Sequence, residues 1–191
     1  MNICVYGASS TAIDKSYIEV VEKLGKMLVE KGHKLVYGAG AQGLMGAVAR
    51  GVHSMGGEII GVSPKFFDVD GILFEDCTEL IYTDTMRQRK QIMEDRAESF
   101  IMVPGGIGTF EEFFEILTLK QLGQHKKPIA VYNINGYYNE MNDMIEQAIE
   151  QKFMKEKCRT LFKLFDNMED IFEYLENYKD DYSDILDMKN I

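Results

Sequence analysis

The stretch of the sequence most suited to chemistry is IMVPGGIGTFEEFFEIL, residues 101–117, in which a glycine-rich corner joins an apolar run to an amphipathic segment. The corner contains Gly105, Gly106 and Gly108. Glycines at this density allow successive backbone N–H groups to point toward one place at the start of a helix, where an anion such as phosphate binds favourably. Two carboxylates, Glu111 and Glu112, follow immediately, although negative side chains repel a phosphate. The stretch therefore predicts a phosphate site, and the two carboxylates beside it need a separate explanation.

Helix capping offers a structural explanation of the carboxylates. Thr109 and Glu112 have the spacing of a capping box, with Thr109 as the N-cap and Glu112 reaching back to the backbone. Acidic residues are favoured in a first helical turn in any case. A cap does not require the preceding Pro-Gly-Gly-x-Gly, however. A carboxylate beside a phosphate suits a reaction in which positive charge develops there, as it does on the sugar when an N-glycosidic bond is cleaved.

A basic cluster precedes this stretch in DTMRQRKQIMEDRA, where three cations fall within residues 87–90 of a strongly acidic chain. On a helix, Met86 and Lys90 share one face and Arg89 lies one residue aside. In isolation such a run is typical of a solvated face that pairs with the acidic residues following it. Its place directly after a predicted strand favours a position on the ligand side of the sheet.

A second glycine-rich segment, GAGAQGLMG, contains Gly38, Gly40 and Gly43 in the pattern GxGxxG. The dinucleotide-binding form of this pattern needs an acidic residue about 20 positions later to hold the ribose hydroxyls. Here the corresponding strand end, residues 62–64, reads Val-Ser-Pro, so the sequence does not favour an NAD site. A tight turn with close helix–strand packing explains these glycines as well as contact with a ligand does.

Short apolar runs alternate with segments of helical periodicity along the chain. The predicted strands cover 2–7, 33–38, 58–63, 78–83, 99–103 and 128–133. The predicted helices cover 17–30, 43–55, 84–97, the segment after the glycine corner and most of the remainder. Strands separated by helices imply a parallel sheet covered on both faces. The sequence therefore predicts a Rossmann-like, doubly wound α/β fold in a single domain, residues 1–191, with ligands at the carboxyl ends of the strands.

Composition excludes several classes of function. The formal net charge of -10 argues against a general nucleic-acid partner, because phosphate backbones require a basic face. The chain has no apolar run of membrane-spanning length and no leader-like N-terminus, and its three cysteines are far apart, as is usual for reduced thiols. We therefore expect a cytoplasmic protein with no membrane partner. The histidines, His33, His53 and His125, are also widely separated, so we expect no metal site and no cofactor.

Several of these motifs resemble one family. PGGIGTFEE matches PGGxGTxxE, MRQRK resembles MHxRK, and GAGAQGLMG resembles GGGxxGLMG. Together with VYGASS and QLGQHKKPIAVYNINGYYN, they make the chain similar to the "Lonely Guy" (LOG) family of cytokinin riboside 5'-monophosphate phosphoribohydrolases, often mislabelled lysine decarboxylases. The resemblance covers roughly 2–153 and leaves 154–191 as a predicted helical extension. The chain departs from the family at Ala39, where the family has glycine, and at Arg87, where it usually has histidine.

The resemblance implies hydrolysis of a purine nucleoside 5'-monophosphate, of cytokinin or adenosine type, to free base and ribose 5-phosphate. Arg89 and Glu112 match the family's catalytic arginine and glutamate. The residues expected to hold the phosphate or the rest of the substrate are Gly43, Met86, Lys90, Gly105, Gly106, Gly108, Thr109 and Glu111. The alternative is a non-catalytic carrier of a nucleotide or of molybdenum cofactor, since such carriers resemble the chain in fold and glycine loops but do not need the carboxylate.

The resemblance also implies a homodimer in which the helix after the motif packs near a two-fold axis. Phe113, Phe114 and Leu117 lie on that predicted helix. They provide more apolar surface than one sheet face needs, so we expect part of it to contact the partner copy.

Overall fold

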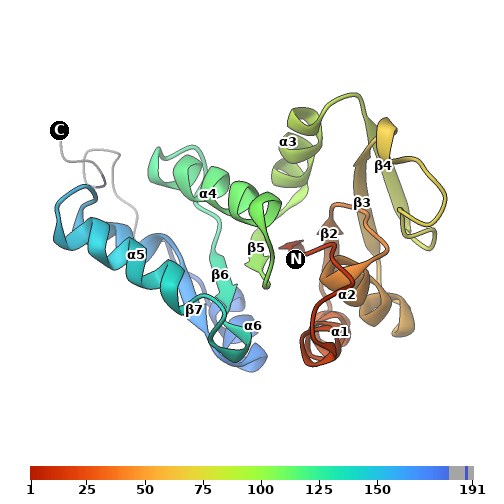
Figure 1. Cartoon of the computed structure of the whole chain (residues 1–191), viewed down its shortest axis with the longest axis horizontal. Coiled ribbons are helices and arrows are strands. Elements are labelled where there is room, and N and C mark those ends of the chain that lie inside the picture. Colours follow the sequence, from red (N-terminus) through yellow and green to blue (C-terminus); the bar gives the residue numbers. More distant parts are fainter. Residues whose placement is uncertain (181–187, 189–191) are drawn as a thin grey trace.

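Seven parallel strands form one sheet in the order β4-β3-β2-β1-β5-β6-β7 in the computed structural model, which describes residues 1–180 and 188 (Figure 1). The strands are β1 (Asn2–Tyr6), β2 (Lys34–Tyr37), β3 (Ile59–Pro64), β4 (Glu79–Thr83), β5 (Ser99–Met102), β6 (Ile129–Tyr132) and β7 (Lys163–Phe165). The first six confirm the predicted strands, with ends shifted by one residue at most. The predicted doubly wound α/β fold is thereby confirmed.

The described part of the chain also contains six α-helices and three short 3-10 helices. The α-helices are α1 (Lys15–Glu30), α2 (Gly43–Ser54), α3 (Met86–Arg96), α4 (Ile107–Gln121), α5 (Asn139–Glu150) and α6 (Met168–Glu176). The 3-10 helices are η1 (Lys65–Phe67), η2 (Ile134–Gly136) and η3 (Glu156–Leu161). None of the described helices is long and apolar enough to span a bilayer.

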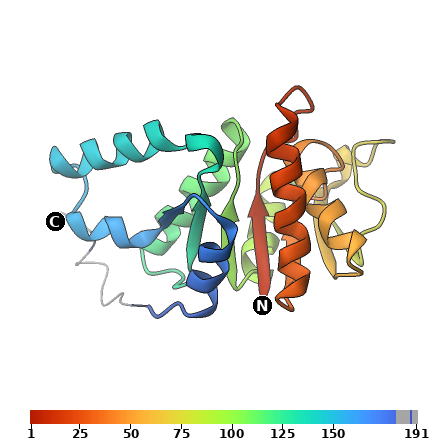
Figure 2. The ribbon, with the colours of Figure 1, turned by 90° about the horizontal axis from the view of Figure 1, so that it is seen from below.

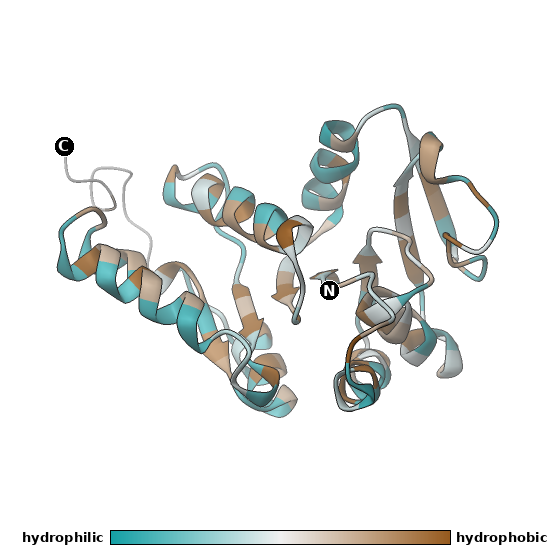
Figure 3. Ribbon diagram, in the orientation of Figure 1, coloured by the Kyte–Doolittle hydropathy of each residue, from teal (hydrophilic) through white to brown (hydrophobic). Residues whose placement is uncertain are grey.

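The sheet separates two hydrophobic cores because successive side chains of a strand point to opposite faces. Ile3 and Val5 of β1 pack with α1, α2 and α6, whereas Cys4 and Tyr6 pack with α3, α4 and α5. Figure 1 shows α1, α2 and α6 below the sheet and α3 and α4 above it, and Figure 2 shows α1 and α2 side by side. The central strands are largely hydrophobic, as expected for strands buried on both faces (Figure 3).

The chain reverses its direction across the sheet between β1 and β5, because β2, β3 and β4 extend to one side of β1 and β5, β6 and β7 to the other. Ligands bind doubly wound sheets at such a switch point. The loops there are joined by backbone hydrogen bonds: Ala8 donates to the carbonyl of Pro104 (3.1 Å) and accepts from Leu44 (2.8 Å). The glycine corner after β5 is therefore fixed to the loops that follow β1 and β2.

The C-terminal region differs from the predicted helical extension. It contains η3 and α6, but also the strand β7, which pairs with β6 at the sheet edge. Three residues are too few for a period-2 pattern to identify a strand. The part of the predicted extension at 181–187 and 189–191 lies outside the described residues.

The stretch after Pro64, which the sequence leaves irregular, lies against the turn between β2 and α2. Ala41 donates to the carbonyl of Ile72 and Phe74 donates to that of Ala39, both at 2.9 Å. Ala39, within this turn, has a left-handed backbone with φ of 59°, at the position where the family that the sequence resembles has glycine. An L-residue with a side chain adopts that conformation at a cost of roughly 1 kcal/mol.

Candidate active site

Helix α4 begins two residues before the predicted cap. Its N-cap is Gly106, with no side-chain cap, and Thr109 lies inside the first turn and is buried. The side chain of Thr109 packs on Gly105, where an added side-chain carbon would overlap Thr109 Oγ1. The Glu112 carboxylate accepts a hydrogen bond from Arg89. The capping-box explanation of Thr109 and Glu112 is therefore wrong.

Two tyrosines that the sequence analysis did not single out form hydrogen bonds with the backbone at and just before the glycine corner. Tyr137 donates through its hydroxyl to the carbonyl of Gly105 (2.7 Å), and Tyr138 donates to that of Val103 (2.8 Å). Burial raises the pKa of Tyr138, and the Gly105 amide opposes that shift by hydrogen bonding to the hydroxyl. Both tyrosines belong to the NINGYYN segment, which follows β6 and is part of the family resemblance.

The other two glycines of the corner face outward. A side-chain carbon on Gly106 or Gly108 would meet no protein atom within 4 Å, and neither residue has a left-handed backbone. The fold itself therefore does not require glycine at these positions. The first turn of a helix leaves its N–H groups without intrahelical acceptors, so these glycines leave room for an anion to approach those donors.

Arg89 and Glu112 form an ion pair above the sheet. Both are buried, at 6% and 8% exposed, and Arg89 Nη1 lies 2.9 Å from Glu112 Oε1. Arg89 Nε also donates to the carbonyl of Val62 in β3 (3.1 Å). The guanidinium lies so close to Gly38 that any side chain there would overlap Nη2, which explains the first glycine of GAGAQG.

The Glu112 carboxylate is in an environment that disfavours its charge. Burial raises its pKa, and the positive charge and hydrogen bond of Arg89 oppose that shift. A negative charge held in a poorly hydrated position interacts strongly with any positive charge that develops beside it. The pair can therefore both position a ligand and stabilise a cationic transition state.

The helix α3 orients its cations differently from the predicted face. Arg89 and Met93 are buried together, whereas Met86 is 38% exposed. Lys90 forms ion pairs with Glu111 and with Glu115 (2.8 Å) of α4. Arg89 and Lys90 thus pair with α4, so the alternative of a solvated face paired with the acids of α3 itself is wrong for these two, whereas Arg87 is exposed. Burial lowers the pKa of Lys90, but the two carboxylates outweigh it and raise the pKa overall.

Gly43 has a structural role that the sequence left open. Its backbone is left-handed, with φ of 60°, and a side-chain carbon would lie 2.5 Å from the carbonyl oxygen of Ala8. Close packing of α2 against the loop after β1 is therefore sufficient to explain this glycine.

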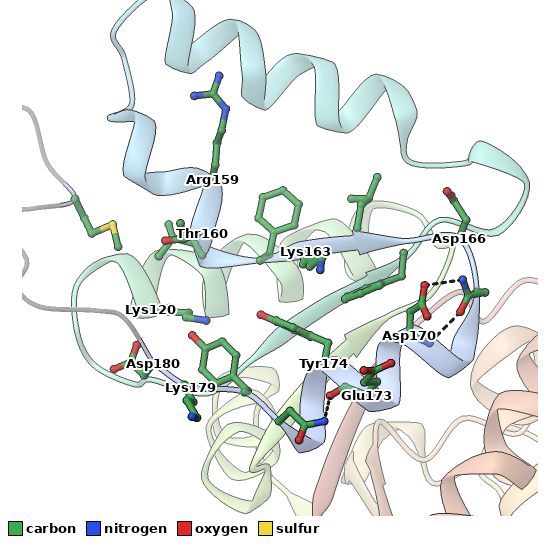
Figure 4. A pocket seen from close by; sticks show the side chains of 18 residues that line it. Lys120, Arg159, Thr160, Lys163, Asp166, Asp170, Glu173, Tyr174, Lys179 and Asp180 are labelled. Carbon is green, nitrogen blue, oxygen red and sulfur yellow. Dashed lines mark hydrogen bonds between the residues drawn. The ribbon is translucent and has the colours of Figure 1, made fainter.

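The site has no metal cluster: within residues 1–180 and 188, no three or more His, Cys, Asp or Glu side chains are grouped to hold an ion. A cavity of about 850 Å³ lies elsewhere, between η3, β7 and α6 (Figure 4). None of the predicted site residues lines it. The chemistry of the corner, rather than cavity volume, identifies the candidate site.

Known proteins resemble the chain over most of its length. The family model described as "Possible lysine decarboxylase" matches residues 45–175. The cytokinin riboside 5'-monophosphate phosphoribohydrolase LOG7 of Arabidopsis thaliana is 38% identical over 183 residues, covering 96% of this chain and 84% of the relative. The enzyme of the same description, LOG, from Oryza sativa subsp. japonica is 38% identical over 180 residues, covering 94% and 74%.

Solved structures share the fold at lower identity. The molybdenum cofactor carrier protein of Chlamydomonas reinhardtii superposes with a TM-score of 0.71 at 19% identity, covering 92% of this chain and 95% of that one. The molybdenum cofactor binding protein of Rippkaea orientalis has a TM-score of 0.64 at 17% identity, covering 92% and 93%. At these identities the likeness concerns the fold alone.

Gly108→Ala should separate stability from ligand binding. Alanine replaces glycine in the first turn of α4 without a clash, so we expect a gain of about 0.5–1 kcal/mol in unfolding free energy. The new methyl occupies the space proposed for the anion, so we expect roughly tenfold weaker binding of a nucleoside monophosphate. Thermal melts measure the stability, and calorimetry measures the binding of the monophosphate.

The control is Thr118→Ala, at an exposed position on the same helix, which should leave binding unchanged. Unaltered binding in Gly108→Ala would exclude the anion site.

Removing one partner of the ion pair should destabilise the protein more than removing both partners, because a single remaining charge stays buried without a counter-charge. Glu112→Leu leaves the Arg89 guanidinium buried without its carboxylate, which should cost about 3–5 kcal/mol of unfolding free energy. Adding Arg89→Met removes the uncompensated charge, so the double variant should recover most of that loss. Urea unfolding of the native protein and of the two variants measures this. A double variant less stable than Glu112→Leu would mean that the pair is retained for stability.

Proposed function

This chain belongs to the LOG family, matched by the model described as possible lysine decarboxylase, and we propose that it hydrolyses a purine nucleoside 5'-monophosphate, of cytokinin or adenosine type, to free base and ribose 5-phosphate. It is a hydrolase that acts on the glycosidic bond of nucleoside monophosphates, since its relatives are named as cytokinin riboside 5'-monophosphate phosphoribohydrolases. The identity of the base is the part that we propose.

The observation that carries the proposal is the position of a buried carboxylate directly behind an open glycine corner. We place the substrate phosphate on the N–H groups around Gly106 and Gly108, where the protein leaves space. Glu112 lies one helical turn further along α4, so the ribose attached to that phosphate extends toward its carboxylate. Binding energy from the phosphate then positions the sugar for reaction.

The reaction breaks the bond between C1' of the ribose and the base nitrogen; water supplies the new C1'–oxygen bond, and one of its protons ends on the departing base. Positive charge develops on the sugar ring as the base leaves. Glu112 stabilises that charge or orients the attacking water, and its burial strengthens the interaction. Arg89 holds the Glu112 carboxylate and is itself held by the Val62 carbonyl, so the carboxylate is fixed before the substrate binds.

The competing functions have less support. A molybdenum cofactor carrier shares the fold, but transport of a ligand gives no reason to bury a carboxylate beside its phosphate. A decarboxylase that forms a Schiff base requires a free lysine amine, whereas Lys90 is engaged by Glu111 and Glu115. We infer a cytoplasmic location as part of the same proposal, because all three cysteines are free thiols.

The proposed reaction is tested by incubating the protein with adenosine and isopentenyladenosine, with their 5'-monophosphates, and with monophosphates of other bases. We expect free purine base from the monophosphates and little from the nucleosides, because the phosphate contributes binding energy used for catalysis. Chromatography resolves the products. Equal turnover of a nucleoside and its monophosphate would contradict the phosphate assignment.

Glu112→Gln should keep the shape of the site and remove its charge. We expect turnover to fall by about a hundredfold or more, on the order of 3 kcal/mol of barrier, in a protein that stays folded. The matched control is Glu115→Gln, which removes an exposed carboxylate one turn further along α4 and should leave turnover near the native value. Native turnover in a folded Glu112→Gln variant would favour the carrier function.

We propose that the chain forms a homodimer, with different contact residues from those expected. Phe113 and Leu117 are buried in the core of the single chain, and Phe114 packs against that core. Apolar side chains exposed beside the site are instead Ile107 (89% exposed) and Met86 (38%). Light scattering at micromolar concentration should give twice the mass of the chain, since closed two-fold dimers are the commonest assembly. A monomer mass would exclude this.

A further inference from the structure

The cavity of about 850 Å³ lies at the opposite end of α4 from the glycine corner (Figure 4). The residues of α4 from Ile107 to Lys120 extend over roughly 20 Å at 1.5 Å per residue. The cavity is therefore separate from the proposed nucleotide site. Its volume falls within the range of small-molecule sites, about 300–1,000 Å³.

Lys120 provides the cavity with a buried ammonium group. Its side chain is only 2% exposed, and no described residue accepts a hydrogen bond from Nζ. The ammonium lies 4.8 Å from the centre of the Tyr178 ring. Burial lowers the pKa of Lys120 to about 8, and the charge of Asp180 opposes that shift. A buried cation without a hydrogen-bonding partner is costly, so this ammonium is well placed to bind an acceptor.

The other cations of the cavity, Arg159, Lys163 and Lys179, are all exposed. Arg159 pairs with Glu146 and, at 3.6 Å, with Glu156. Lys163 lies over the rings of Phe165 (5.1 Å) and Tyr174 (5.9 Å). Lys120 is thus the buried one among the cations that line this cavity in the described chain. Figure 4 shows its amine and the ring of Tyr174 facing the same space.

We propose that this cavity binds a small organic monoanion, a carboxylate on an aromatic or apolar body, with the carboxylate on Lys120 Nζ and the body against the rings of Tyr174 and Tyr178. A monoanion is favoured over a phosphate dianion because acidic side chains, including Asp166, Asp170 and Glu173, also line the cavity and repel further negative charge. Aromatic walls with one polar anchor are typical of small-molecule sites.

Benzoate is a suitable probe for calorimetry on the full chain. We expect it to bind, and we expect phenyl phosphate and neutral benzyl alcohol to bind at least about tenfold more weakly. Lys120→Met should reduce benzoate affinity by about tenfold or more. The control Lys163→Met removes an exposed cation of the same cavity and should change affinity by less than about threefold. Equal benzoate affinity in Lys120→Met, or no binding to the native protein, would overturn the proposal.

Two further measurements keep the test independent of folding and of the nucleotide site. Lys120→Met removes a buried charge whose Nζ has no hydrogen-bond acceptor among the described residues, so its melting temperature should rise and nucleotide turnover should stay unchanged. On the native protein, benzoate should slow reductive methylation of Lys120, followed by mass spectrometry of its peptide. Methylation of Lys120 at the same rate with and without benzoate would also overturn the proposal.

Discussion

The buried ion pair between Arg89 and Glu112 is the constraint on which the rest of the site depends. Removing two charges from water costs several kcal/mol for each ion, and their attraction repays this only with good geometry and further hydrogen bonds. The protein meets that condition with the Val62 carbonyl and with the bare backbone of Gly38. A capping box formed by Thr85 and Gln88 fixes the first turn of α3. Gln88 directly precedes Arg89, so the cap also fixes the backbone that carries Arg89.

The regular elements were predictable because their patterns are local. Strands buried on both faces give continuous apolar runs, and six of them were located from the sequence within one residue. The start of α4 was not predictable in the same way. The spacing of Thr109 and Glu112 suits a cap, but the contact of Thr109 with Gly105 and the bonds from Tyr137 and Tyr138 come from tertiary packing. Packing outweighs a capping preference of about 1 kcal/mol.

The candidate site was predicted mainly through motifs, because its members are distant in sequence. Arg89 and Glu112 are separated by a strand, and only the fold brings α3 beside α4. Residue type alone could not predict which carboxylate each cation pairs with, since Arg89 and Lys90 are adjacent in sequence yet pair with different carboxylates. The roles of Gly38 and Gly43 likewise follow from the backbone and side chains that lie against them, which a GxGxxG pattern does not specify.

The pairing of charges also explains how a strongly acidic chain can offer an anion site next to three glutamates. Lys90 compensates Glu111 and Glu115, and Arg89 compensates Glu112. The field at the start of α4 is then set by the helix dipole and the free N–H groups, which favour an anion. Of the three carboxylates, Glu112 is the buried one. Solvent therefore screens its charge least, and that charge acts most strongly on a cation forming beside the bound phosphate.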